Sequence, residues 1–322
     1  MDLSTRYLDL QLDGPLILGA SPLAADVDAA QRAQDAGASA LVMSSLFEEQ
    51  SPRGYASGFY PADRKQFNFG PVEYLEQVRR LKAALRIPVI GSLNGTTNGG
   101  WLKFAAQIDQ AGADALELNI YRVCTDFERS AASIEDEAVE MVRSVVAETT
   151  LPVAVKLSPY YTALPQFALR LLDAGAKGLV LFNRFLQPEV DIARREVVSE
   201  VAYSTSLELS LRLRWLAILS PKLEASLAIT GGVHNAEDAL KAILTGADGV
   251  QLVSEILQHG FVRFSKIRNQ MSEWLEQRGY HSLAQVRDTM NLADSANPSD
   301  FERVNYLHVL HSYPNVREWG VR

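Results

Sequence analysis

The chain's single cysteine, Cys124, lies in the segment LELNIYRVCTDFE, residues 116 to 128. This segment begins as an apolar run and continues with Asn119, Tyr121 and Arg122. A cysteine among polar groups just after a buried strand is a candidate catalytic group. The alternative is an inert thiol that lines a pocket or packs beside it.

A second candidate is Lys156, near the end of the apolar run VAVKLS, residues 153 to 158. A lysine in such a run is costly to bury unless an opposite charge or a ligand meets it. Three roles fit this residue type: an internal salt bridge, a Schiff-base amine, or a cation beside an electron-rich cofactor.

A third candidate is the glycine pair Gly231 and Gly232 in ITGGVHNAEDAL, residues 229 to 240. Glycines allow close backbone approach, and the N-terminal NH groups of a following helix bind anions. Ser254, in LVSEIL, is placed to begin a similar turn. The pattern predicts a phosphorylated ligand, with a plain glycine turn as the alternative.

These residues follow short apolar runs without polar alternation, which is typical of parallel strands buried on both faces. The runs cover residues 15–20, 40–45, 88–93, 115–121, 153–158, 178–183, 227–232 and 249–254. Amphipathic stretches such as residues 71–85 and 236–246 lie between them, and four phrases of the type DAGASALVM place glycine where a helix ends.

Eight alternating strand and helix units predict an α/β protein with a (β/α)8 barrel fold. The alternative, an open doubly wound sheet, lacks its usual GxGxxG turn after the first strand. Long insertions at about residues 46–70 and 185–206 follow strand ends, where a barrel carries its active site. We expect the barrel in residues 1–280 and a C-terminal extension, residues 281–322, packed on the barrel or on a partner subunit.

Composition excludes several classes of protein. Hydrophobic residues make up 47% and charged residues 22%, as in a soluble globular protein with a substantial core. A net charge of −8 argues against binding to nucleic acid, and one cysteine allows no internal disulfide. No run of about 20 apolar residues predicts a membrane span. We expect a cytoplasmic protein without a bound metal.

Several motifs, taken in order along residues 1 to 280, resemble the dihydroorotate dehydrogenase family. NIYRVC stands where the family has N-x-S-C-P-N, VKLSP resembles VKLPP, and TGGV resembles TGGI. FNFGPVEYLEQV, residues 67 to 78, resembles the family's asparagine-glycine loop before a helix.

The resemblance implies FMN as cofactor, with Lys156 beside the flavin's electron-rich edge, where its charge would favour the reduced anion. It places the phosphate on the backbone of Gly231, Gly232, Val253 and Ser254. The other residues assigned to the cofactor are Ala20, Ser44 and Asn119, and those assigned to the substrate are Asn68, Asn119, Asn183 and Arg184.

The catalytic part of the family pattern differs here. Aligned on Asn119, the family's catalytic cysteine or serine falls at Arg122, and arginine is a poor base because it stays protonated. Cys124 takes that place only if the loop shifts by two residues. Arg122 and Arg184 would suit an anionic substrate if both face the mouth of the barrel, at the C-terminal ends of its strands. The alternative is that both side chains are solvated at the surface. The candidate catalytic residues are therefore Lys156, Arg122 and Cys124.

The resulting prediction is an FMN-dependent dehydrogenase that acts on CH–CH groups, of the kind used in pyrimidine biosynthesis. It would transfer a hydride between FMN and a small dihydropyrimidine-like or anionic substrate. We expect a homodimer that binds neither nucleic acid nor membranes. The alternatives are a non-catalytic flavin-binding or electron-transfer subunit, and a flavin-free Schiff-base barrel that uses Lys156.

Overall fold

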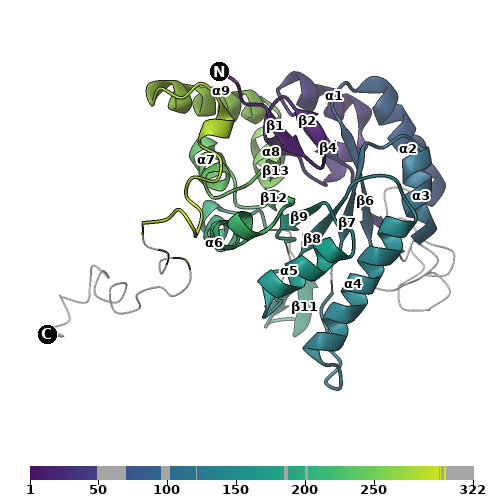
Figure 1. Ribbon diagram of the computed structural model, residues 1–322. Helices are drawn as coiled ribbons and strands as arrows, with labels where there is room; N and C mark the ends of the chain where they lie inside the picture. Colours follow the sequence, from purple (N-terminus) through teal and green to yellow (C-terminus); the bar gives the residue numbers. More distant parts are fainter. Residues whose placement is uncertain are drawn as a thin grey trace, which may run out of the picture.

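Eight parallel strands close into a barrel in the computed structural model (Figure 1). The structure describes residues 1–48, 70–95, 102–120, 122–184, 188–199, 202–296, 298 and 301. The barrel strands are β3 (Leu16–Leu18), β4 (Ala40–Val42), β6 (Val89–Asn94), β7 (Ala115–Asn119), β8 (Val153–Leu157), β9 (Gly178–Leu181), β12 (Ser226–Thr230) and β13 (Gly249–Leu252). The strand order is closed because β4 pairs with both β3 and β6. The predicted barrel is therefore confirmed, and the open sheet is excluded.

Helices surround the barrel, and all but the last two of those described connect its strands (Figure 1). They are α1 (Val27–Asp35), α2 (Pro71–Ala84), α3 (Lys103–Gln110), α4 (Ala131–Ala147), α5 (Leu164–Asp173), α6 (Leu209–Leu219), α7 (Ala236–Leu244), α8 (Ser254–His259) and α9 (Val262–Gln277). The side chains of Asp26, Ser130 and Asn235 cap α1, α4 and α7. Gly37 and Gly175 follow α1 and α5 with φ of +106° and +105°, a left-handed conformation that explains the repeated glycine phrases.

An N-terminal hairpin closes the end of the barrel where the strands begin. It consists of β1 (Thr5–Tyr7) and β2 (Leu10–Leu12), which pair antiparallel. Tyr7 and Leu8 are each 1% exposed and pack against interior side chains of the barrel strands. The Leu8 backbone NH donates to Ser226 Oγ at the start of β12, over 2.9 Å. This hairpin was not predicted from the sequence.

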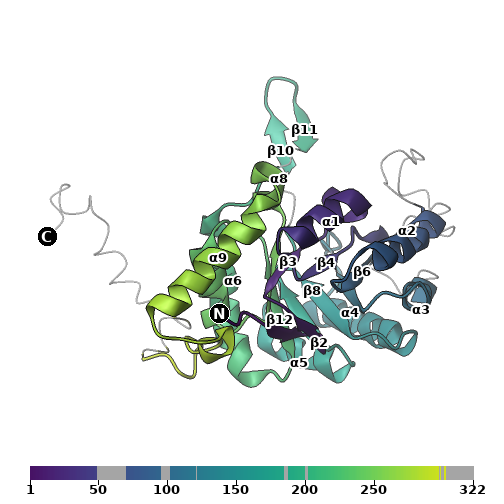
Figure 2. The ribbon, with the colours of Figure 1, turned by 90° about the horizontal axis from the view of Figure 1, so that it is seen from above.

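A second hairpin, β10 (Pro188–Asp191) with β11 (Glu196–Ser199), projects from the barrel in Figure 2. It lies in the insertion expected at residues 185–206, after the C-terminal end of β9. In the insertion expected at 46–70, β5 (Leu46–Phe47) pairs with the end of β6, and residues 49–69 lie outside the described part. Both insertions therefore begin at the same end of the barrel.

The chain after α9 packs on the barrel as far as residue 292. Leu283 and Val286 are buried in the main core, and the backbone NH groups of Met290 and Leu292 donate to carbonyls at Leu244 and Ala217. The division at residue 280 and any contact of the extension with a partner remain predictions. None of the described helices has the length and apolar character needed to cross a membrane.

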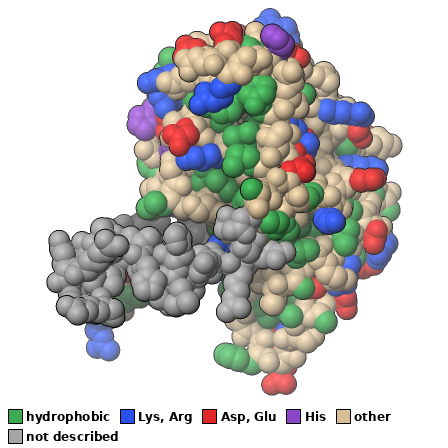
Figure 3. All heavy atoms as spheres, turned by 60° about the vertical axis from the view of Figure 1, so that its left-hand side comes forward, with side chains coloured by type: hydrophobic (Ala, Val, Ile, Leu, Met, Phe, Trp, Pro, Cys, Tyr) green, Lys and Arg blue, Asp and Glu red, His purple; other side chains and the backbone are tan. Residues whose placement is uncertain are grey.

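Charged side chains of both signs are interspersed with hydrophobic ones on the face in Figure 3. Among the described residues drawn in colour, neither sign of charge covers this face.

The hairpin that closes the barrel floor gives a test of the fold. We expect Tyr7→Ala to lower the free energy of unfolding by about 3 to 5 kcal/mol, because a large buried aromatic is replaced by a cavity. Urea denaturation measures this change. The matched control is Arg6→Ala on the same strand, where the side chain is 71% exposed, and we expect about 0.5 kcal/mol or less. Equal effects of the two substitutions would contradict the packing described.

Candidate active site

The barrel interior contains a buried ion pair near the C-terminal end of the strands. Lys156 Nζ lies 3.0 Å from Glu117 Oε1, and Gln251 Nε2 donates to Glu117 Oε2 over 2.6 Å. Glu117 and Gln251 are 1% exposed and Lys156 is 6% exposed. The three residues come from β7, β8 and β13, so the closed barrel brings them together.

This pair explains how a lysine is tolerated in an apolar strand. A buried charge is stable only when it is paired and hydrogen-bonded, and both carboxylate oxygens of Glu117 have donors. An ammonium carries three donors, and the hydrogen bond from Lys156 to Glu117 uses one of them. The slightly exposed Lys156 therefore presents a fixed positive charge toward the mouth.

Two asparagines predicted to bind substrate lie together at this end of the barrel. Asn119 is opposite Lys156 in the β7–β8 register, and its Oδ1 accepts from Asn183 Nδ2 over 3.1 Å. The backbone NH of Asn183 donates to the carbonyl of Leu157, which fixes the start of its loop. Asn68 lies outside the described residues.

The two residues assigned to the cofactor near the first strands also lie at strand ends. Ala20 is half-buried and packs against the buried side chains inside the barrel. Ser44 Oγ donates to the carbonyl of Ser21 over 2.8 Å. Both side chains are small.

Arg122 and Cys124 are placed differently from Lys156. Arg122 Nη1 lies 2.6 Å from Glu137 on α4, and Arg129 binds the other oxygen of the same carboxylate. Hydrogen bonds from Arg129 and then Arg122 lower the pKa of Glu137. The exposed thiol of Cys124 contacts the carbonyl of Asp126 over 3.6 Å. Their catalytic roles remain predictions.

Arg184 lines a cavity of about 370 Å³ together with Arg212. Arg212 is buried, and its Nε and Nη1 donate to the carbonyls of Thr230 and Glu208 over 2.5 and 2.7 Å. The pKa of Arg212 is lowered, mainly by burial. The negative charge of Glu208 opposes this shift, and the positive charge of Arg184 adds to it. Arg184 was predicted from the sequence, whereas Arg212 was not.

The glycine pair after β12 is explained by both backbone conformation and packing. Gly231 and Gly232 have φ of +79° and +83°. A Cβ at Gly231 would lie 2.9 Å from Arg212 Nη2, and one at Gly232 would lie 2.8 Å from the Leu209 backbone nitrogen. The glycines therefore allow the start of α6 to pack on the end of β12, with or without a ligand.

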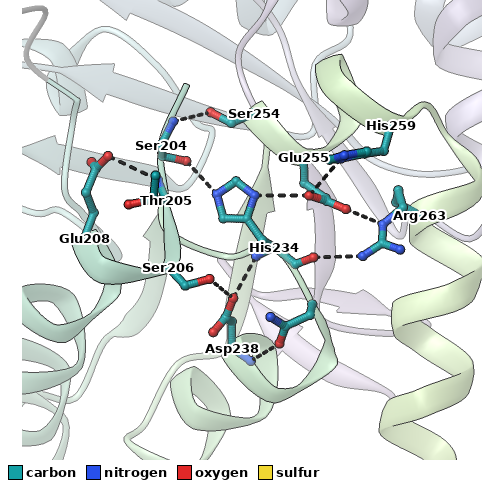
Figure 4. A network of polar contacts seen from close by, with 11 residues as sticks. Ser204, Thr205, Ser206, Glu208, His234, Asp238, Ser254, Glu255, His259 and Arg263 are labelled. Carbon is teal, nitrogen blue, oxygen red and sulfur yellow. Dashed lines mark hydrogen bonds and ion pairs between the residues drawn. The ribbon is translucent and has the colours of Figure 1, made fainter. Parts of the chain in front are cut away.

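A polar network surrounds the predicted phosphate end of the site (Figure 4). The Ser204 backbone NH donates to Ser254 Oγ, and Ser204 Oγ lies 3.1 Å from His234 Nε2. His234 Nδ1 lies 3.1 Å from Glu255 Oε2. The network ties the segment before α6 to the residues that follow β12 and β13.

Buried Glu255 is the centre of this network in Figure 4. Its carboxylate contacts His234, His259 and Arg263, and Arg263 Nη2 also donates to the carbonyl of His234 over 2.9 Å. Among the described residues, no group of three or more His, Cys, Asp or Glu side chains is placed to hold a metal ion.

Several of these groups could not be recognised from the sequence. Glu117 and Gln251 stand inside apolar runs, and His234 and Glu255 follow strand ends without matching a familiar motif. The available signal was the two-residue alternation in LELN, which puts Glu117 and Asn119 on the same side of β7.

The buried ion pair can be tested by a double-mutant cycle with Glu117→Gln and Lys156→Met. We expect each single substitution to cost about 3 to 5 kcal/mol of unfolding free energy, because a buried charge loses its partner. The double variant should cost less than the sum of the two. Urea denaturation supplies the free energies.

The matched control is the exposed pair Glu76 and Arg79, with a distance of 3.3 Å. We expect its coupling energy to be about 0.5 kcal/mol or less. Additive effects at Glu117 and Lys156 would show that the interior pair is not coupled.

Comparison with known proteins identifies the family. A family model described as dihydroorotate dehydrogenase matches residues 67 to 275. The catalytic subunit of dihydroorotate dehydrogenase B (NAD(+)) from Pyrococcus abyssi is 26% identical over 301 residues, 88% of this chain and 97% of that protein. The subunit of the same name from Methanocaldococcus jannaschii is 24% identical over 292 residues, 85% of this chain and 94% of that protein. The one from Citrifermentans bemidjiense is 32% identical over 194 residues, 58% of this chain and 62% of that protein. These relationships support an oxidoreductase of this general type, and they show that the chain belongs to the dihydroorotate dehydrogenase family.

Proposed function

We propose that this protein is an FMN-dependent oxidoreductase that acts on a small dihydropyrimidine-like or anionic substrate at the C-terminal mouth of the barrel. The observation that carries the proposal is Lys156, a buried cation held by Glu117 beside the linked amides of Asn119 and Asn183. Family membership supports the same conclusion.

The residues at the mouth fit the flavin end of FMN. The Lys156 ammonium retains donors beyond the one directed to Glu117, and a fixed cation suits the electron-rich edge of a flavin. Ala20 and Ser44 add small side chains at neighbouring strand ends. Bound FMN would supply the hydride acceptor or donor, which no protein side chain provides.

The ends of the neighbouring strands β12 and β13 fit the phosphate end. Gly231, Gly232, Val253 and Ser254 follow these strands. Ser254 Oγ accepts from the Ser204 NH, so its own hydroxyl proton is available to a phosphate oxygen. We assign these four residues to the phosphate.

The protein's own groups would orient the substrate and handle its proton. Asn183 uses one amide hydrogen on Asn119, which leaves its other hydrogen and its Oδ1 for substrate polar groups. Arginine is a poor base, and Arg122 is bound by Glu137. In this proposal the proton leaves to Cys124 or to a water molecule.

The structure favours this function over the Schiff-base alternative. An amine must be uncharged to attack a carbonyl, whereas Lys156 forms an ion pair with Glu117. A non-catalytic flavin subunit differs from the proposed enzyme only in that no substrate reduces its flavin. A homodimer and a cytoplasmic location remain predictions.

The direct test is the anaerobic visible spectrum of the FMN-saturated protein before and after addition of dihydroorotate. We expect the flavin bands to bleach. We expect Lys156→Met to slow the bleaching at least about tenfold, equivalent to about 1.4 kcal/mol of activation free energy, while exposed Lys103→Met leaves the rate unchanged.

Two results would count against the proposal. Flavin bands that dihydroorotate leaves unchanged would remove dihydroorotate as the substrate. A protein that takes up no FMN would overturn the assignment of the cofactor.

A further inference from the structure

A cavity of about 370 Å³ lies beside the mouth, between the segment after β8, the end of β9 and the start of α6. Its apolar wall is formed by Tyr160, Phe182, Leu207 and Leu211. Small-molecule sites are typically cavities of this size, with apolar walls and a few fixed polar groups. The wall therefore suits an apolar or aromatic body.

The described charged groups that line the cavity carry a net positive charge. Among them, the two guanidinium groups of Arg184 and Arg212 share the carboxylate of Glu208. The Glu208 oxygens lie 3.4 Å from Arg184 Nη2 and 4.0 Å from Arg212 Nη2. Charge-assisted hydrogen bonds are usually about 2.7 to 2.9 Å, so Glu208 saturates neither cation.

The two arginines have different surroundings. The Arg212 side chain is 6% exposed, and backbone carbonyls fix it in place. The Arg184 side chain is 31% exposed and contacts the carbonyl of Ala202. Arg184 is thus the residue that an entering anion would meet, and Arg212 adds a fixed charge behind it.

The cavity is connected with the proposed reaction site through Asn183. This residue lines the cavity, and its side chain donates to Asn119, which lies opposite Lys156 in the β7–β8 register. A ligand in the cavity would therefore reach the amides at the mouth.

We propose that this cavity binds a carboxylate carried on an apolar or aromatic body, with Arg184 as the anion-binding residue and Glu208 as the competing internal carboxylate. This proposal rests on the proposed function in one respect, that the ligand of the cavity is the substrate of the proposed reaction site. It names a substrate class with an apolar body, because the wall beside the arginines is apolar.

The test is isothermal titration calorimetry of the full chain with benzoate and with its uncharged analogue benzamide. We expect benzoate to bind and benzamide to bind at least tenfold more weakly. Arg184→Gln should weaken benzoate binding at least tenfold, because a charge-assisted contact is lost.

Glu208→Gln should act in the opposite direction and strengthen benzoate binding. Glu208 accepts from the Thr205 NH in a capping box at the 3₁₀ turn η6 (Ser206–Glu208), and glutamine retains that acceptor while it removes the competing charge. Arg194→Gln is the control, because Arg194 lies in the projecting hairpin with a 74% exposed side chain. This variant should bind benzoate as the wild type does.

Two outcomes would overturn the proposal: equal benzoate binding by Arg184→Gln and Arg194→Gln, or weaker binding by Glu208→Gln. The same preparations are also tested for FMN uptake and for bleaching by dihydroorotate. Benzoate binding with the expected variant pattern in a protein that takes up no FMN would support the cavity and refute the proposed function. Bleaching by dihydroorotate, without the expected pattern of benzoate binding among the variants, would support the proposed function and refute the cavity proposal.

Discussion

The ion pair between Glu117 and Lys156 is the interaction on which the rest of the site depends. A charged pair inside a barrel has lost its hydration, so it is stable only if the two charges are paired and hydrogen-bonded. Gln251 satisfies the second carboxylate oxygen, and the N-terminal hairpin closes the floor. Burial, and next the negative charge of Glu117, raise the pKa of Tyr7 in that hairpin well above its usual range. The floor and the ion pair are thus parts of one packed interior.

The opposite wall of the site depends on close approach of α6 to the end of β12. Gly231 and Gly232 leave room for Arg212 and for the backbone of Leu209. Arg212 then joins Thr230 on β12 to the turn before α6, and this fixes one side of the cavity. A single packing contact therefore determines both the turn after β12 and the charge of the neighbouring cavity.

The sequence predicted the fold well because barrel strands leave a strong pattern. Apolar runs marked all eight strands, and glycines with positive φ marked helix ends such as Gly37 and Gly175. Lys156 was recognisable because a charge interrupts an apolar run. Its partner was not, since pairing Glu117 with Lys156 requires the β7–β8 register. Arg122 was placed by alignment alone, and its contact with Glu137 depends on how α4 packs.

The midpoint reduction potential of bound FMN tests the central claim most directly, because charges near a flavin tune its potential. If Lys156 lies beside the flavin, Lys156→Met should lower the potential by at least about 30 mV, equivalent to about 1.4 kcal/mol for a two-electron couple. Glu117→Gln should raise it, because a negative charge is removed. A potential that neither substitution changes would contradict the placement of the flavin over this ion pair.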